Sequence, residues 1–284
     1  MREDDPGRIR AILETDRNWA VYALGDLAPE HAPHCEWRAT PPAPGAGSAR
    51  SGRCEPGAGD ALLLIYRAFD LPVLFSLGAP EAVRPLLAEV AEPRLYLLIR
   101  PEILPLVEAL GAVGHRQAMW RMILDASAFQ APAAGAAAPL GPADFPALEA
   151  LYADGAAAGE APDFFSRAQV ENGPFYGIWE SGRLIAAAGT HLVSADLNVG
   201  AVGNVYVRRD HRGRGLGRVV TGAVTAALLA QGATTLALNV NQANASALRV
   251  YERLGFRRYC AFWEGILERR GEADYGGGAS QLSR

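Results

Sequence analysis

The stretch VYVRRDHRGRGLGRVVTGAVTAALLAQG (205–232) decides how the second half of this sequence folds. It begins as an apolar strand, turns at the alternating glycines Gly213, Gly215 and Gly217, and continues as a helical pattern that ends at Gly232. Glycine permits a positive φ and lets a ligand approach the backbone closely. The free N–H groups of the helix that follows point at the same bend and favour an anion. The stretch therefore predicts an anion-binding turn between a strand and a helix.

Arginines surround this turn. Five of them lie within residues 208–218, whereas the whole chain is acidic, with 27 Lys+Arg against 31 Asp+Glu and a net charge of −4. They are Arg208, Arg209, Arg212, Arg214 and Arg218. Guanidinium groups beside free backbone amides favour a pyrophosphate as the ligand. A basic, solvated loop that only caps a helix is the alternative interpretation.

The spacing of the turn excludes two of the usual pyrophosphate sites. A P-loop nucleotide triphosphatase needs a lysine after its glycines, and the sequence contains no lysine. The dinucleotide fingerprint GxGxxG fits only loosely, and the strand 235–241 (TLALNVN) supplies no acidic residue for a ribose. The pattern that does fit is R-x-x-G-x-G, at Arg212, Gly215 and Gly217.

A second pattern follows one helix and one strand later, in NVNQANASALRVYERLGF (239–256). It has the form N-x-x-A-x-x-x-Y-x-x-x-G-F, with matches at Asn244, Ala247, Tyr251, Gly255 and Phe256. Together the two patterns resemble the acyl-CoA N-acyltransferase (GNAT) superfamily over roughly residues 138–270. A chain of two such halves is similar to glycine N-acyltransferase-like proteins, and mycothiol synthase is another tandem precedent.

The resemblance implies an α/β fold with a mixed sheet, in which acyl-CoA lies between two splayed parallel strands, here 201–207 and 235–241. It implies that pantetheine pairs with the backbone of Val205, Tyr206 and Val207, as an added strand would. A backbone N–H of this strand would polarise the thioester carbonyl. The other residues implied to bind the cofactor are Arg212, Gly213, Arg214, Gly215, Leu216, Gly217, Arg218, Asn239 and Asn244.

The resemblance also implies catalytic roles. Tyr251 is the expected general acid, because a phenol can protonate a departing thiolate; packing between helix and sheet is the alternative. Asn244 is expected to bind pantetheine, to cap the helix 245–255, or both. His191 is the expected general base, with a pKa suited to the task. Glu180, Glu171 or a chain of waters are the alternatives.

Aromatic residues flank the region where the acceptor would bind. Phe164 and Phe175 are the expected substrate contacts, and the predicted helix 162–173 would cover the substrate. Burial in the core is the alternative for these rings. The acceptor cleft is the part of the site that the sequence defines least.

The chain divides at segments rich in Pro, Gly and Ala. We expect a degenerate GNAT-like N-terminal domain at 1–126 with a flexible insertion at 38–60, a linker at 127–141, a catalytic GNAT domain at 142–270 and a flexible tail at 271–284. The two halves share an order of hairpin, strand, helix, strand, short helix and long strand, with Gly111 and Gly255 in matching places. The first half lacks R-x-x-G-x-G; its junction reads SLGAPEAV (76–83).

The function that follows is acetyl transfer from acetyl-CoA to a primary amine of a small molecule, by direct transfer in a ternary complex. A non-catalytic acyl-CoA sensor that recruits a partner, and a protein N-acetyltransferase, are the alternatives. Three cysteines without CxxC spacing predict neither a disulfide framework nor a metal site. The acidic balance predicts no nucleic-acid or membrane partner, and the N-terminal sequence predicts a cytoplasmic protein. A homodimer is compatible with the sequence.

Overall fold

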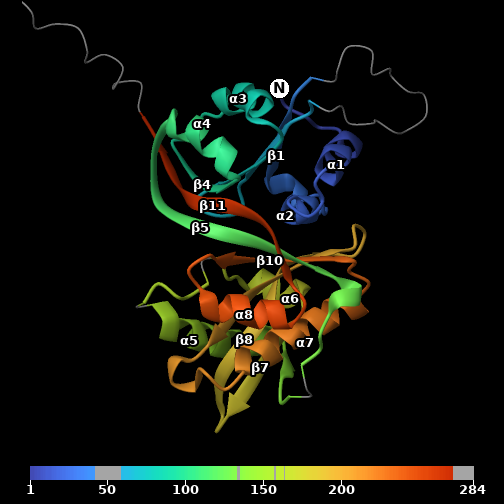
Figure 1. The fold of residues 1–284 in the computed structure, drawn as a ribbon, viewed down its shortest axis with the longest axis vertical. Coiled ribbons are helices and arrows are strands. Elements are labelled where there is room, and N and C mark those ends of the chain that lie inside the picture. The colour runs from blue at the N-terminus through green and yellow to red at the C-terminus, as the bar shows by residue number, and fades with distance from the viewer. Residues whose placement is uncertain (42–58, 133–134, 157, 163, 271–284) are drawn as a thin grey trace, which may run out of the picture. The chain divides into compact units, whose positions relative to one another are not determined.

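A computed structural model describes residues 1–41, 59–132, 135–156, 158–162 and 164–270. The chain forms two units (Figure 1). Unit 1 comprises Met1–Met119 together with Ala261–Arg284, and unit 2 comprises Trp120–Cys260. The proposed insertion falls largely on residues 42–58 and the proposed tail on 271–284, so both lie outside the described residues.

Unit 1 is a mixed sheet with helices. Its strands follow the order β1-β2-β3-β4-β11, where β11 is Arg257–Arg269; β3 pairs with β4 in parallel, whereas the pairs β1–β2, β2–β3 and β4–β11 are antiparallel. The elements are α1 (Pro6–Glu14), α2 (Val21–Gly25), β1 (Cys35–Ala39), β2 (Leu62–Tyr66), β3 (Val73–Leu77), α3 (Pro80–Ala88), β4 (Arg94–Ile99), α4 (Leu104–Glu108) and the first part of β5 (Gly111–Asp125).

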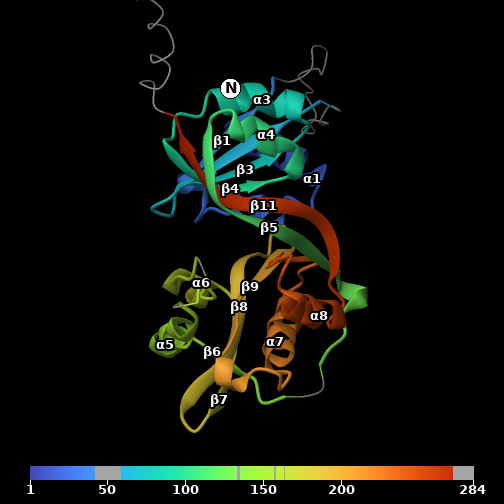
Figure 2. The same cartoon turned by 60° about the vertical axis from the view of Figure 1, so that its left-hand side comes forward.

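Unit 2 repeats this plan. Its strands follow the order β10-β9-β8-β7-β6, with β9 and β10 parallel, and Figure 2 shows α5 and α6 on one face of the sheet and α7 and α8 on the other. The elements are β6 (Ala138–Leu140), α5 (Phe145–Ala156), α6 (Arg167–Asn172), β7 (Phe175–Glu180), β8 (Arg183–Ser194), β9 (Val199–Val207), α7 (Leu216–Ala230), β10 (Thr235–Asn241), α8 (Ala245–Arg253) and β11 (Arg257–Arg269).

The helix α7 shows why this part of the sequence folds as predicted. Val220, Val224 and Leu228 recur every four residues, all three are fully buried, and they belong to one core cluster with Leu236 of β10. Such spacing places them on one face of the helix. The helix therefore lies on the sheet with its N-terminus at the end of β9, where the arginine-rich turn is.

The last strand of each half crosses from one unit to the other. Met122 and Leu124 of β5 belong to the core of unit 2, whereas Leu267 of β11 belongs to the core of unit 1. In unit 1, β11 pairs antiparallel with β4, from Trp263 opposite Ile99 onward. The unit boundary therefore differs from the expected one, because the end of the range 142–270 completes the sheet of unit 1.

Several local expectations differ from the structure. The expected helix 162–173 is helical only over α6, because Ser166 is its N-cap and the Ser166 N–H donates to Gln169 Oε1 at 3.1 Å. The strands β1 and β6 were not predicted, since each is short and adjoins a segment rich in Pro and Ala. β6 lies inside the expected linker 127–141 and pairs antiparallel with β7.

Candidate active site

The site of interest begins where β9 and β10 part. Their parallel pairing runs only from Val199 opposite Thr235 to Ala201 opposite Ala237. Both strands continue beyond that point, β9 to Val207 and β10 to Asn241. The ends of two adjacent parallel strands are therefore splayed, as the resemblance implied.

The backbone of β9 offers free groups on the splayed side. Arg208 N donates to Ile185 O at 2.9 Å, and Tyr206 lies opposite Ala187, so these residues pair with β8. Because N–H and C=O groups alternate in direction along a strand, those of Val205 and Val207 face away from β8. An extended, amide-bearing ligand could pair with them as an added strand.

The side chains of this segment separate into two faces. Tyr206 packs in the core cluster below α5, and its hydroxyl donates to Asp154 Oδ2 at 3.1 Å. Val205 and Val207 pack against the cluster that contains α7 and α8. With its backbone paired to β8 and its hydroxyl bonded to Asp154, Tyr206 differs from the expectation, and the groups that face the opening belong to Val205 and Val207.

The glycines of the turn differ in backbone conformation. Gly213 and Gly215 have φ values of 79° and 77°, a left-handed conformation that side chains rarely adopt. Gly217 has no positive φ, and a Cβ there would meet only Val207 Cγ2 at an ordinary 3.6 Å. The fold itself thus leaves room for a side chain at Gly217.

The amides of this turn are available. Among the described residues, the N–H groups of residues 213–217 donate no backbone hydrogen bond, while Arg218 N and Val219 N both turn back to Gly215 O, at 3.1 and 3.3 Å. The N-cap of α7 is Gly215, which has no side chain to cap the helix. The bend is neither filled nor satisfied by the described protein, so an anion can bind the helix N-terminus there.

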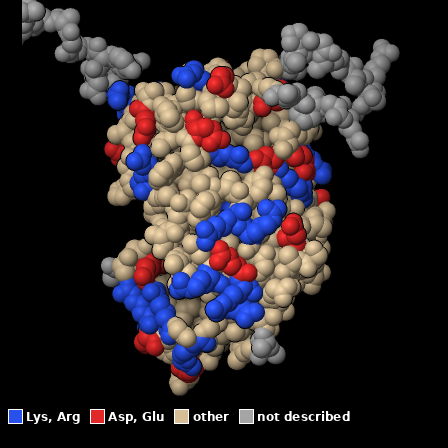
Figure 3. Space-filling view, viewed as in Figure 1, with Lys and Arg blue, Asp and Glu red and all other residues tan. Residues whose placement is uncertain are grey.

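Carboxylates hold most of the arginines beside the bend. On the face of the molecule drawn in Figure 3, acidic and basic side chains lie next to one another. Arg212 lies 2.7 Å from Glu160, which also pairs with Arg209 at 3.3 Å. The hydrogen bond from Arg212 is the main cause that lowers the pKa of Glu160. The charges needed for a pyrophosphate are present and are partly neutralised.

Two further arginines differ in their surroundings. Arg214 lies 2.9 Å from Glu180, and this contact is the main cause that lowers the pKa of that carboxyl. Arg218 has no carboxylate within 4.0 Å in the described part of the chain. Glu180 thus pairs with Arg214 and also contacts His211 Nε2 at 2.8 Å, so it is not a free carboxylate that could act as the base.

Tyr251 lies on α8 with its ring buried, 7% exposed, in the core cluster of α7 and β10. Burial raises its pKa to about 12, so the phenol stays protonated at neutral pH. No described residue forms a hydrogen bond with its hydroxyl group. The Tyr251 ring packs in the core, as the alternative interpretation proposed, and its hydroxyl group still has a proton to donate.

Two asparagines flank the opening. Asn244 caps α8, since its Oδ1 accepts from Ala247 N at 3.0 Å. Asn239 stands on β10, two residues beyond the last paired residue Ala237, and its Oδ1 is buried with no hydrogen-bond donor among the described residues. An amide N–H of an extended ligand would satisfy it.

His191 stands on β8 beside Gly203 of β9, where a Cβ at Gly203 would meet the imidazole at 2.2 Å. Burial, assisted by the charge of Arg121, lowers the pKa of His191 to about 4. Its imidazole is therefore neutral at pH 7 and a weaker base than the sequence suggested.

The two expected substrate contacts differ in burial. Phe175 is 1% exposed and packs against Phe165, with ring centroids 6.1 Å apart, so it is a core residue rather than a wall of an open cleft. Glycine at position 189 is needed to make room for its ring. Phe164 is half-buried and keeps its role as an expectation.

The part of the chain that contains this site is similar to proteins of a known family. The family model described as Acetyltransferase (GNAT) family matches residues 145–256. These residues belong to the GNAT acetyltransferase family. The range includes the turn, the splayed strands and Tyr251 (residues 201–251), and all of it lies in unit 2.

Individual relatives agree with the GNAT assignment. A 63-residue segment is 44% identical to mycothiol acetyltransferase from Thermobispora bispora, and the chain spans only 21% of the length of that curated relative. A solved structure assigned to the GNAT family, from Novosphingobium aromaticivorans, is 26% identical with a TM-score of 0.54, covering 74% of this chain and 89% of that one.

A Drosophila protein of known structure shares the fold, with a TM-score of 0.63 at 14% identity, covering 90% of this chain and 89% of that chain. The similarity to glycine N-acyltransferase-like proteins stays a prediction. In the described residues no cluster of His, Cys, Asp or Glu could hold a metal, and no helix is both long and apolar enough to cross a membrane.

The corresponding opening in unit 1 is filled by the protein. The parallel pairing of β3 and β4 ends at Phe75 opposite Leu98, and Ser76 O faces the β4 side, as Pro72 O does when it accepts from Tyr96 N. Trp19, which is fully buried, donates its indole N–H to Ser76 O at 2.9 Å. A side chain thus occupies the place that the GNAT domain leaves open.

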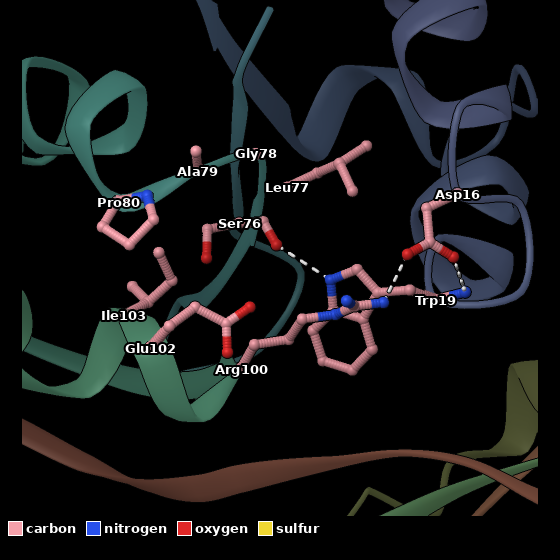
Figure 4. Close-up of a pocket in the computed structure, with 10 residues that line it drawn as sticks. All are labelled: Asp16, Trp19, Ser76, Leu77, Gly78, Ala79, Pro80, Arg100, Glu102 and Ile103. Atoms are coloured by element: carbon pink, nitrogen blue, oxygen red, sulfur yellow. Dashed lines mark hydrogen bonds and ion pairs between the residues drawn. The ribbon is translucent and has the colours of Figure 1, made fainter. Parts of the chain in front are cut away.

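A pocket of about 380 Å³ remains beside Trp19, and Figure 4 shows its lining. Its polar groups include Asp16 paired with Arg100, whose guanidinium lies 5.4 Å from the Trp19 ring. The helix α3 begins with Pro80, which has no N–H, and Glu81 is its second residue. These residues disfavour an anion at this junction.

One residue near the GNAT site was not singled out from the sequence. Asn204 interrupts the apolar strand 201–207 after Gly203, and it has a positive φ of 52°. Asn204 and Val205 together lie opposite the single residue Ala188, and this pairing of two residues with one is a β-bulge. The pair Gly-Asn inside an apolar strand is the signal that indicates such a bulge.

Proposed function

We propose that unit 2 is an N-acetyltransferase that moves an acetyl group from acetyl-CoA to a primary amine of a small molecule. The observation that carries this proposal is the open bend at 213–217, where free amides and arginines meet the N-terminus of α7. The likeness to a mycothiol acetyltransferase supports a small acceptor. The proposal takes the pyrophosphate to lie on this bend.

The residues along the opening fit the rest of such a donor. The free N–H and C=O groups of Val205 and Val207 would pair with pantetheine, and Asn239 Oδ1 would accept one of its amide N–H groups. Asn244 caps α8 and leaves its Nδ2 free for the same ligand. Of these groups, Asn239 Oδ1 is buried and has no partner among the described residues.

In the proposed reaction, acetyl-CoA supplies an activated acyl group. The amine nitrogen forms a bond to the carbonyl carbon while the carbon–sulfur bond breaks. Val205 N–H donates to the carbonyl oxygen as negative charge develops on it. Tyr251 gives its phenolic proton to the departing sulfur, since its pKa of about 12 keeps it protonated until then.

The proton that leaves the amine passes through His191 to water. A pKa of about 4 means that His191 holds this proton only briefly, so it acts as a relay. The amine, with a pKa of about 10 in water, must therefore bind in its neutral form. Activity should rise with pH for that reason.

Calorimetry with acetyl-CoA and with desulfo-CoA tests the donor. Binding of both, and loss of both in Gly217→Trp, supports the proposal, whereas no binding to either contradicts it. A primary-amine panel then separates the alternatives. A non-catalytic sensor binds acetyl-CoA without turnover, and a protein acetyltransferase acetylates peptides in preference to small amines.

A further inference from the structure

The bulge residue Asn204 carries a side chain that its backbone conformation does not explain. A φ of 52° favours Asn or Gly, and either would form the bulge opposite Ala188. The side chain of Asn204 is only 3% exposed, so its amide must find partners within the protein or in a ligand.

Two contacts fix the orientation of this amide. Asn204 Nδ2 donates to Gln169 Oε1 at 3.1 Å and to Thr190 O at 3.3 Å. Both partners are oxygens, so the nitrogen of the amide must face them. Gln169 is held in turn by Ser166 N, which donates to the same Oε1 at 3.1 Å. The amide therefore cannot rotate without losing these bonds.

The backbone of the bulge is held as well. Tyr152 donates its hydroxyl proton to Asn204 O at 2.8 Å, and burial raises the pKa of Tyr152, which keeps that proton in place. The side chain and the main chain of Asn204 are thus anchored to α5, to α6 and to β8. Asn204 is a fixed feature of the site before any ligand binds.

The oxygen at the other end of this amide has no partner. No described residue donates a hydrogen bond to Asn204 Oδ1, although the atom is buried. Asn204 stands on the part of β9 that has parted from β10, three residues beyond the last paired residue, Ala201.

We propose that Asn204 Oδ1 accepts an N–H of the acceptor amine. This inference rests on the proposed function of unit 2. Asn204 adjoins Val205, whose N–H faces the same opening, so an amine held by Asn204 would lie next to the thioester carbonyl.

The chemistry of an amide oxygen suits this role. It accepts an N–H from a neutral amine and leaves the nitrogen lone pair free to attack. A carboxylate at the same place would stabilise the ammonium form and raise the pKa of the amine. Asn204 thus selects an acceptor that has an N–H to donate and that reacts in its neutral form.

The test uses Asn204→Gly, which keeps the left-handed backbone and removes the amide. Asn198→Gly is the matched control, because Asn198 also has a positive φ, 53°, and lies in the turn before β9. Each protein is assayed with acetyl-CoA and primary alkylamines from methylamine to hexylamine, and the acetyl-CoA Kd is measured by calorimetry. We expect Asn204→Gly to lower kcat/KM for the amines about 10- to 100-fold with an unchanged acetyl-CoA Kd, and Asn198→Gly to leave both unchanged.

A second variant gives a readout that a structural role would not move. Asn204→Asp places a carboxylate beside the amine, so the rise of kcat/KM with pH should shift to higher pH than in the wild type. An unshifted profile in this variant would contradict the inference.

The remaining outcomes separate the two proposals. If the wild type binds no acetyl-CoA, the proposed function fails. If it binds acetyl-CoA but acetylates none of the alkylamines, the non-catalytic alternative holds and the proposed function fails as well. If it acetylates them and Asn204→Gly keeps its kcat/KM within twofold, only the role of Asn204 is wrong. An equal loss of acetyl-CoA affinity in Asn204→Gly also overturns that role.

Discussion

The junctions β9–α7 and β3–α3 occupy the same place in two copies of one plan, and they differ in the groups that their helix starts present. In unit 2 the helix begins with Leu216 and Gly217, whose N–H groups are free. In unit 1 it begins with Pro80, which has no N–H, and Glu81, whose charge repels an anion. The difference shows that a fold supplies a helix N-terminus, and that three or four side chains decide whether it is a site.

The residues that precede Gly255 in unit 2 also differ from those that precede Gly111 in unit 1. Counting back four residues from Gly255 gives Tyr251, whereas the same count from Gly111 gives Val107, which has no proton to donate. Counting back eleven gives Asn244 in unit 2 and Arg100 in unit 1. Unit 1 thus has neither a tyrosine nor an asparagine at the places that correspond to Tyr251 and Asn244.

Of the differences between the two units, the one at Tyr251 should have the largest effect on activity. Tyr251→Phe keeps the buried ring and removes the proton, so kcat should fall about 10²- to 10⁴-fold, as expected for loss of a general acid. The acetyl-CoA Kd and the melting temperature should stay close to the wild-type values. Steady-state kinetics with calorimetry measure this, and an unchanged kcat would leave Tyr251 a packing residue only.

The next effect is expected in unit 1. Trp19→Ala removes a fully buried indole and its hydrogen bond to Ser76 O, so the free energy of unfolding should fall by about 3–5 kcal/mol. Acetyl-CoA should still bind with a stoichiometry of one, because the β3–α3 junction carries Pro80 and Glu81. Urea unfolding and calorimetry check both points. Binding of a second acetyl-CoA would show that Trp19 alone closes unit 1.

A matched pair of tryptophans compares the two helix starts directly. Gly217→Trp places a ring on the second residue of α7, so acetyl-CoA affinity should fall at least about 100-fold, or about 2.7 kcal/mol. Glu81→Trp changes the equivalent residue of α3 and should leave the affinity unchanged. Calorimetry measures both, with circular dichroism as the folding control. Equal effects of the two variants would mean that the junctions do not differ in function.

Unit 1 should also show a pH dependence of its own. Burial raises the pKa of Asp26 from 3.8 to about 8, so the folded protein keeps a proton that the unfolded chain releases near pH 4. The stability that this supplies is complete below about pH 4 and is lost as the pH rises through 8. Asp26→Asn should flatten the decline of the melting temperature between pH 5 and 8, by roughly 2–4 °C for each kcal/mol. Parallel curves for variant and wild type would contradict a buried, protonated carboxyl.

The smallest effect concerns the carboxylate beside the arginines. Glu160 pairs with Arg209 and Arg212 and so competes with a pyrophosphate for them. Exposed pairs of this kind are worth about 0.2–1 kcal/mol, so Glu160→Gln should tighten acetyl-CoA binding by about 1.4- to 5-fold, most strongly at low salt. Weaker binding in the variant would indicate instead that Glu160 positions Arg212 for the ligand.

The order of elements was predictable from the sequence where the signals are local. The apolar pattern TLALNVN predicted a strand at 235–241, and β10 has these bounds, Thr235–Asn241. The short strand β6 was missed, because three residues of pairing with β7 leave no periodicity to detect. Phe175 was assigned to the substrate cleft because an aromatic residue at a strand start has the same pattern in a core as at a surface.

The sequence by itself determined the bend at 213–217 and the helix after it, because φ at a glycine and the start of a helix depend on neighbouring residues. Only the tertiary structure decided that Trp19 closes the opening of unit 1, 57 residues away from Ser76 in the chain. It also decided that the Asn204 nitrogen bonds Gln169 and Thr190, while its oxygen has no partner among the described residues. Such contacts join residues distant in the chain, and the partner of a buried polar atom is set by packing rather than by local preference.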